Sequence, residues 1–259
     1  MFFNVGDCVT RNSYDNDIIF KITGIENNTV LLKGVDVRLY ADSDISDLRK
    51  EENREPDDSQ YIDEFNDITN LDRNEYFYLP GRILHIDGDN EYLERCLNFY
   101  KKLKLKAKGL NIKEPDIYQE IGKFLIEFNP DILVITGHDA YNKKQGEVDD
   151  IDNYRNTKNF IKAVKAARTV ENNPEKLIII AGACQSNFEE LIKSGANFAS
   201  SPKRINIHAL DPAIVASNIS IAKKNTEINL LDIISKTKYG KDGIGGIITN
   251  GTMYVGYPR

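Results

Sequence analysis

Three largely apolar runs, each separated from the next by segments with helical periodicity, constrain the fold of this 259-residue chain more than any other feature. They lie at residues 83–86, 131–136 and 177–181. A strand that is apolar along its whole length is buried on both faces, as happens in parallel sheets covered by helices. We therefore predict an α/β fold with a doubly wound, mainly parallel sheet and flanking helices.

Apolar side chains at helical spacing predict the helices of this domain. We expect them at about 90–106, 115–128 and 154–170, with another from Asp211 to about Lys224. A further β-like run covers 205–208, and a glycine-rich tail begins at Tyr239.

The first part of the chain has a different pattern. Short β-like runs at 17–23 and 29–33 are separated by Gly24 and by the pair Asn27 and Asn28. Short strands at this spacing are typical of a small barrel. We therefore predict a small SH3-like β-barrel domain over residues 1–45.

The negative charge of the chain is concentrated between these two regions. Residues 36–75 hold 14 acidic and 5 basic side chains, a net of -9, whereas the whole chain has a net charge of -6. Residues 51–60 include no large apolar side chain, so they bury too little surface to offset the entropy cost of ordering. We predict a mobile acidic linker over 46–75 and an α/β domain over 76–259.

Composition argues against several classes of protein. No long Lys/Arg stripe indicates nucleic-acid binding, and the lysines of 101–108 are interpreted as a solvated helix end. The longest apolar run, 177–184, is too short to span a membrane, and the N-terminus lacks the features of a secretory signal. Three Cys and three His favour neither a disulfide framework nor a zinc site. We expect no metal or cofactor, no membrane, and a reducing, cytoplasmic compartment.

Cys184 is the first candidate catalytic residue. In doubly wound sheets, reacting groups collect beyond the carboxyl ends of the strands. Cys184 follows the strand at 177–181, and the S-x-x-E pattern from Ser186 to Glu189 predicts a helix cap directly after it. A thiol at the start of a helix favours the nucleophilic thiolate. The alternative is a buried structural cysteine.

His138 is the second candidate. It follows the strand at 131–136 and precedes Cys184 by 46 residues. If the two strands are neighbours, the imidazole can act as general base for the thiol. Alone, His138 could equally be a loop or capping histidine; together, the two residues indicate a Cys/His nucleophilic site.

Asp87 and Asp89 form another candidate group, a carboxylate pair for a metal or phosphoryl site. The alternative is that Asp89 caps the helix beginning near Asn90, and we favour it. His85 and His208 are interpreted as buried histidines with hydrogen-bond partners.

One strand ending in His and a later strand ending in Ala-Cys resemble the caspase-like cysteine peptidases. The resemblance implies a catalytic dyad of His138 and Cys184, without an obligatory third acid. These families usually have Gly after the His, whereas this chain has Asp139. The backbone N–H groups of Asp139 and Cys184 would then hold the oxyanion.

Ordered blocks along nearly the whole chain are similar to the YabG family of sporulation-specific peptidases. The blocks are GDCVTR at 6–11, LKGVDVRLYAD at 32–42, LHIDGD at 84–89, VITGHD at 134–139, AGACQS at 181–186, NFASSPKR at 197–204 and NIHALDP at 206–212. The resemblance implies a cysteine peptidase in the mother cell of a sporulating bacterium, associated with the developing spore coat. Its partners would be spore coat and related proteins, cleaved beside Arg or Lys.

A basic substrate side chain requires a partly desolvated carboxylate in the specificity pocket. Asp139 and Asp211 are the candidates for substrate binding, since each follows a predicted strand. Arg49, Lys50 and Arg54 are candidate self-cleavage points. Two alternative functions remain open: a non-enzymatic coat assembly or docking protein, and a metal-dependent phosphohydrolase that uses Asp87 and Asp89. The oligomeric state does not follow from the sequence.

Overall fold

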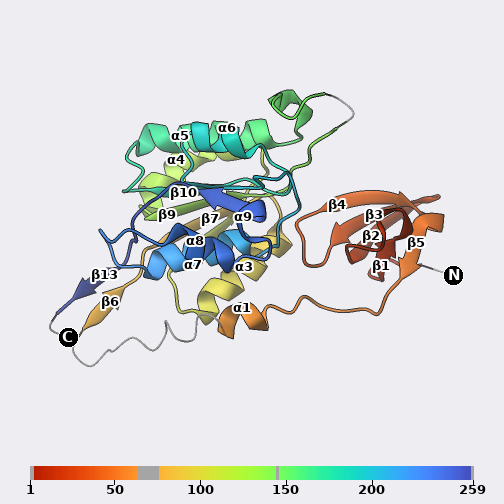
Figure 1. Ribbon diagram of the computed structural model, residues 1–259, viewed down its shortest axis with the longest axis horizontal. Coiled ribbons are helices and arrows are strands. Elements are labelled where there is room, and N and C mark those ends of the chain that lie inside the picture. Colours follow the sequence, from red (N-terminus) through yellow and green to blue (C-terminus); the bar gives the residue numbers. More distant parts are fainter. Residues whose placement is uncertain (1–2, 64–75, 144–145, 258–259) are drawn as a thin grey trace. The chain divides into compact units, whose positions relative to one another are not determined.

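The computed structural model describes residues 3–63, 76–143 and 146–257. The chain forms two compact units, Met1–Asp58 and Ser59–Arg259 (Figure 1). The first unit therefore extends beyond residue 45, where the sequence pattern placed the end of the small β domain.

The first unit is a five-stranded antiparallel sheet with the strand order β4-β3-β2-β1-β5. Its strands are β1 (Cys8–Arg11), β2 (Phe20–Glu26), β3 (Thr29–Gly34), β4 (Tyr40–Asp44) and β5 (Leu48–Lys50), with 3-10 turns η1 (Asn12–Tyr14) and η2 (Ile45–Asp47). Both predicted β runs form strands. Gly24 does not separate them: it lies inside β2 at a shift of register, and the turn falls at Asn27, whose φ is 56°. The SH3-like topology stays a prediction.

The start of the predicted linker is attached to the first unit. Leu48–Lys50 form β5, which pairs with β1, and Asn53 Oδ1 accepts the backbone N–H of Cys8 at 2.8 Å. Arg54 forms an ion pair with Asp36. The remainder includes the short helix α1 (Ser59–Asp63), and residues 64–75 of the predicted linker lie outside the described residues.

A six-stranded sheet with the order β12-β11-β10-β9-β7-β8 organises the second unit. Its strands are β7 (Ile83–Asp87), β8 (Ala107–Asn111), β9 (Ile132–Thr136), β10 (Ile178–Ala181), β11 (Phe198–Ser200) and β12 (Ile244–Gly246). All pairs are parallel except that of β11 with β12. The prediction of a mainly parallel sheet is confirmed. A separate two-stranded sheet joins β6 (Phe77–Leu79) to β13 (Tyr254–Gly256).

Helices cover both faces of the six-stranded sheet, with α4, α5 and α6 on one side and α3, α7 and α8 on the other (Figure 1). The helices of this unit are α3 (Asn90–Lys102), α4 (Ile117–Phe128), α5 (Thr157–Val170), α6 (Phe188–Lys193), α7 (Asp211–Ile221), α8 (Leu230–Ser235) and α9 (Gly240–Gly243), with the 3-10 turn η3 (Ile151–Asn153). The helix predicted to reach residue 106 ends earlier, because Lys104 takes a positive φ of 57°.

The apolar strands alternate their side chains between the two cores, as their sequence requires. In β9, Ile132 and Val134 pack with α3, α7 and α8, whereas Leu133 and Ile135 pack with α4 and α5. All four are fully buried. Burying a strand on both faces in this way stabilises the fold by about 1.5–3 kcal/mol for each large apolar side chain.

The structure corrects two sequence interpretations in the second unit. Residues 205–208 form a loop, not a strand, and the strand of this region is the earlier β11. The lysines at 101–108 do not all belong to a helix end, because Lys108 lies in the edge strand β8. Charged side chains are common on edge strands, where they oppose pairing with other chains.

No helix within residues 3–63, 76–143 and 146–257 combines the length and hydrophobicity needed to cross a membrane. The three cysteines, Cys8, Cys96 and Cys184, are buried and reduced.

Candidate active site

The register of the sheet places His138 and Cys184 just beyond the carboxyl ends of two neighbouring strands. Strands β9 and β10 are parallel neighbours in which Ile135 pairs with Ala181. His138 and Cys184 each lie three residues beyond this pair. The condition that the two strands are neighbours is therefore met, and their following loops begin at the same rim of the sheet.

His138 lies between two acidic side chains. Its backbone N–H donates to Glu114 Oε1 at 2.7 Å, and its ring atom Nδ1 lies 3.8 Å from the same oxygen. The other ring nitrogen, Nε2, lies 3.7 Å from Asp89 Oδ2. The Tyr92 ring packs against the imidazole, with centroids 5.7 Å apart. Carboxylates on both sides favour the charged imidazolium.

Cys184 is fully buried, and its sulfur contacts the loop after β11. The backbone N–H of Ile207 donates to Sγ at 3.3 Å. A donor directed at sulfur is a stronger partner for a thiolate than for a thiol, because it interacts with a full negative charge. Since the side chain is buried, a substrate can reach the sulfur only after a change from this arrangement.

The predicted capping box after Cys184 is wrong. Helix α6 begins at Phe188, and its N-cap is Asn187, whose side chain accepts the N–H of Glu190 at 3.2 Å. Ser186 has another role: its hydroxyl accepts the N–H of Ala183 at 3.0 Å. Helix α6 begins four residues after Cys184, and the donor that the structure directs at Sγ is the backbone N–H of Ile207.

The Asp139 carboxylate joins the two rim loops. Oδ2 accepts hydrogen bonds from the hydroxyls of Thr157 at 2.5 Å and Ser186 at 2.8 Å. Oδ1 accepts the backbone N–H groups of Asn156 at 2.7 Å and Ala140 at 2.9 Å. Four donors thus surround one buried carboxylate, and they come from the loop after β9, the start of α5 and the loop after β10.

Burial raises the pKa of the Asp139 carboxyl above its ordinary value, although the hydrogen bonds from Thr157, Asn156, Ser186 and Ala140 each act to lower the pKa. The same network continues through the hydroxyl groups, since Thr157 Oγ1 accepts the backbone N–H of Asn187 at 3.0 Å. It therefore holds the chain on both sides of Cys184.

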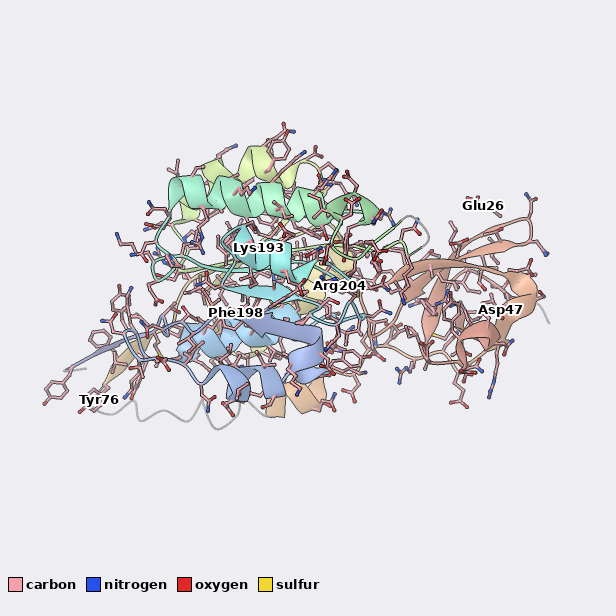
Figure 2. The ribbon with its side chains drawn as sticks, turned by 45° about the horizontal axis from the view of Figure 1, so that its top comes forward. Glu26, Asp47, Tyr76, Lys193, Phe198 and Arg204 are labelled. Atoms are coloured by element: carbon pink, nitrogen blue, oxygen red, sulfur yellow. The ribbon has the colours of Figure 1, made fainter. Side chains whose placement is uncertain are left out.

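A second set of contacts connects the Cys184 loop to the segment after β11. Gln185 takes a positive φ of 57°, its N–H donates to Ile205 O at 3.0 Å, and its side chain accepts the N–H of Tyr141 at 3.2 Å. Arg204 follows Phe198 of β11 along the chain (Figure 2). Its Nε donates to the Tyr154 hydroxyl at 2.8 Å. Burial raises the pKa of Tyr154 above its ordinary value.

Asp211, the other predicted substrate-binding carboxylate, is fully buried at the first residue of α7. Its Oδ2 accepts the N–H of His208 at 2.9 Å, and its Oδ1 accepts the N–H of Lys238 at 3.0 Å. His208 follows Ile207, the donor to the Cys184 sulfur. Asp211 is therefore linked to the nucleophile through adjacent peptide groups.

Asp87 and Asp89 have the structural roles that we favoured. Asp89 is the N-cap of α3 and accepts the N–H groups of Glu91 at 2.9 Å and Tyr92 at 3.1 Å. Asp87 accepts the Thr136 hydroxyl at 2.8 Å. Within the described residues, no group of three or more His, Cys, Asp or Glu side chains has the arrangement of a metal site.

The interpretation of His85 as a buried histidine with partners is confirmed: its ring contacts the Tyr100 hydroxyl and Thr136 Oγ1, both at 3.0 Å. Glu114 is the site residue that the sequence reasoning missed. It follows β8, a strand with lysine and glycine in place of an apolar run, so hydrophobic periodicity did not indicate that this segment reaches the rim of the sheet. The signal that could have indicated it is the pair Gly88 and Gly137, each directly after an apolar strand.

Comparison with known proteins identifies the family. The model of the YabG peptidase U57 family matches residues 4–70 and 58–258. The sporulation-specific protease YabG of Bacillus subtilis (strain 168) is 41% identical over 291 residues, which cover 100% of this chain and 99% of that protein. The chain belongs to the YabG peptidase family. Membership in this family of sporulation proteases favours a peptidase over the docking protein and the phosphohydrolase.

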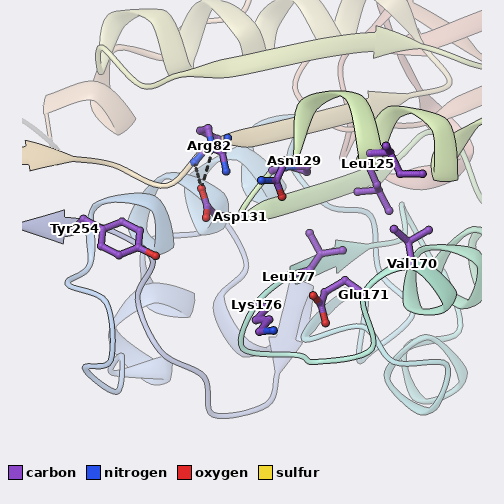
Figure 3. Close-up of a pocket in the computed structure, with 11 residues that line it drawn as sticks. Arg82, Leu125, Asn129, Asp131, Val170, Glu171, Lys176, Leu177 and Tyr254 are labelled. Atoms are coloured by element: carbon purple, nitrogen blue, oxygen red, sulfur yellow. Dashed lines mark hydrogen bonds and ion pairs between the residues drawn. The ribbon is translucent and has the colours of Figure 1, made fainter.

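The chain also has a pocket of about 520 Å³ at the opposite ends of the strands (Figure 3). It lies beside the first residues of β9 and β10, with Asp131 and Leu177 in its wall. Arg82 and Asp131 form an ion pair there at 3.4 Å. Because His138 and Cys184 follow the other ends of these strands, this pocket is separate from the candidate active site.

Proposed function

We propose that this YabG-family chain is a cysteine endopeptidase of sporulation in which Cys184 is the nucleophile and His138 the general base. The observation that carries the proposal is that the two residues follow adjacent parallel strands at equal distances from a register pair. The buried Asp139 network between their loops supports it. We also propose that the fold is caspase-like, because the sheet is mainly parallel and has helices on both faces.

In the proposed reaction, His138 takes the Cys184 proton and the thiolate attacks the substrate carbonyl. The imidazolium then protonates the leaving amine, and water hydrolyses the acyl-enzyme. The N–H of Ile207 stabilises the thiolate before attack. The Asp89 and Glu114 carboxylates stabilise the imidazolium that forms during the reaction.

We assign the oxyanion to the backbone N–H groups of Asp139 and Cys184. The N–H of His138 is engaged by Glu114, whereas the N–H of Asp139 has no acceptor among the residues that the structure describes. A donor without a competing acceptor is available for the charge that develops on the substrate oxygen.

The proposed substrates are spore coat and related proteins, cleaved beside Arg or Lys in the mother cell. Of the two candidate pocket carboxylates we favour Asp211. The Asp139 oxygens already accept four hydrogen bonds, about the capacity of a carboxylate. Asp211 is linked through His208 to the donor that contacts the Cys184 sulfur.

A matched pair of peptides that differ only in Arg or Gln at the cleavage position tests this specificity. We expect kcat/KM to be about 100-fold higher for the Arg peptide, because only the charged Arg side chain can form an ion pair with the Asp211 carboxylate. Asp211→Asn should remove most of the preference, whereas Asp242→Asn, at an exposed position, should retain it. Equal turnover of both peptides by the unmodified chain would contradict the assignment.

We also propose self-processing at Arg54, which of the three predicted positions is the one outside a β-strand. Arg49, Lys50 and Arg54 are all exposed, but Arg49 and Lys50 lie in the hydrogen-bonded strand β5, whereas Arg54 lies outside any strand. A segment outside the strands enters a peptidase cleft without unfolding a sheet, once side-chain contacts such as the Arg54–Asp36 ion pair are released. Intact-mass analysis after long incubation should show cleavage at Arg54, which Arg54→Gln prevents and Arg49→Gln does not. A single full-length species that remains active would contradict self-processing.

A further inference from the structure

We propose that Glu114 is the positioning residue for His138, so that the site operates as a Glu114–His138–Cys184 set. This inference rests on the proposed function of His138 and Cys184. Glu114 follows β8, the strand at the edge of the sheet beyond β7, and its side chain is buried. A buried carboxylate requires compensating donors or charges, and those of Glu114 belong to His138.

Glu114 holds both the backbone and the ring of the histidine. The 2.7 Å hydrogen bond from the His138 N–H to Oε1 fixes the course of the chain at the end of β9. The same oxygen lies 3.8 Å from Nδ1, where it favours a proton on that nitrogen and stabilises the imidazolium. A single carboxylate oxygen thus restrains the position and the charge of the proposed base.

The glycines at the ends of two strands make room for this carboxylate. A Cβ atom at Gly137 would lie 2.3 Å from Glu114 Oε1, and one at Gly88 would lie 2.4 Å from the same atom. Any larger residue at either position would displace the carboxylate. Lys113, the preceding residue, donates to Gly88 O at 3.0 Å and so attaches this segment to the loop after β7.

Other groups around His138 differ from Glu114 in function. Asp89 Oδ2 faces Nε2 at 3.7 Å and contributes to stabilising the imidazolium, but the same side chain also caps α3, so substituting Asp89 would disturb the helix as well. The Tyr92 ring packs against the imidazole and supplies no carboxylate. The basic side chain next to Glu114 in the sequence, Lys113, donates to Gly88 O and not to the Glu114 carboxylate.

The test compares Glu114→Gln with Glu114→Asp in the full-length chain, with Glu120→Gln, at an exposed position on α4, as the control. Gln retains an oxygen for the backbone N–H but loses the charge. We expect kcat for an Arg-containing peptide to fall about 10- to 100-fold with little change in KM. We also expect the titration midpoint of His138, measured by NMR on 13C-labelled histidine, to fall by about one pH unit. Asp should recover part of both losses, and the control should match the unmodified chain.

The inference is overturned if Glu114→Gln retains kcat, or if the His138 titration does not move in a variant with an unchanged unfolding transition. The NMR titration detects the Glu114–His138 contact without an activity assay, so a loss of stability is not mistaken for a loss of catalysis. Cys184→Ala and His138→Ala, assayed in the same series, separate the two hypotheses. If both remain active, the proposed function fails; if both are inactive while Glu114→Gln is fully active, only the role of Glu114 fails.

Discussion

Alanine at position 184 should lower kcat for peptide hydrolysis by about 10⁴-fold or more, because it removes the atom that forms the acyl-enzyme. Substrate binding should change little, since the residue contributes only one buried sulfur to the rim. The measurement is steady-state hydrolysis of an Arg-containing peptide, with the unfolding transition recorded for each variant.

The other two cysteines provide matched controls. Cys8 and Cys96 are also buried and reduced, but Cys8 lies in β1 and Cys96 in the packed face of α3. Their alanine variants should lose stability without losing the chemical step. His138→Ala should be nearly as inactive as Cys184→Ala, and the double variant no worse than either, because residues that act as a unit have non-additive effects. Substantial turnover by Cys184→Ala would contradict the assignment.

Asp139→Ala should have the largest effect on stability, lowering the free energy of unfolding by about 3 kcal/mol or more. It leaves the backbone N–H groups of Asn156 and Ala140 and the hydroxyls of Thr157 and Ser186 without their acceptor in a buried region. Chemical denaturation measures this loss. Activity should fall as well, because Ser186 no longer restrains the loop that carries Cys184.

Asp139→Asn is the matched variant, since Asn retains the size of Asp and one acceptor oxygen. Burial raises the pKa of Asp139 in the folded chain above the ordinary 3.8. The folded chain therefore retains a proton that the unfolded chain releases, so this group lowers stability as pH rises from about 3.8 through the folded pKa. Asn does not titrate. The unfolding free energy of the unmodified chain minus that of Asp139→Asn should therefore fall with rising pH, and a rise would contradict the raised pKa.

The fold could be predicted where hydrophobic periodicity is strong. Apolar spacing alone predicts strands β7, β9 and β10 and helices α3, α4 and α5. A strand buried on both faces must be apolar along its length, and a helix packed on the sheet must be apolar along one side. Strand β8 was missed because an edge strand buries less and tolerates lysine and glycine. Strand β11 was missed because Phe198–Ser200 is too short to show a period.

The candidate site could be predicted only in part, for a related reason. His138 and Cys184 come directly after strongly apolar strands, so predicting the strands also predicted that both residues lie at the rim of the sheet. Glu114 follows the strand that carried no such signal. The S-x-x-E pattern at Ser186 was misread because a local motif competes with tertiary contacts: Ser186 binds Asp139, which lies far away in the sequence, and Asn187 caps the helix.

Covalent labelling tests the central claim most directly. The full-length chain would be treated with a peptidyl ketone inhibitor that ends in arginine and alkylates a catalytic thiolate, then digested and mapped by mass spectrometry. We predict one label, on Cys184, absent from Cys8 and Cys96, formed in step with the loss of activity and slowed strongly in His138→Ala. Complete loss of activity with the label on another residue, or full activity with Cys184 quantitatively labelled, would contradict the assignment of Cys184 as the nucleophile.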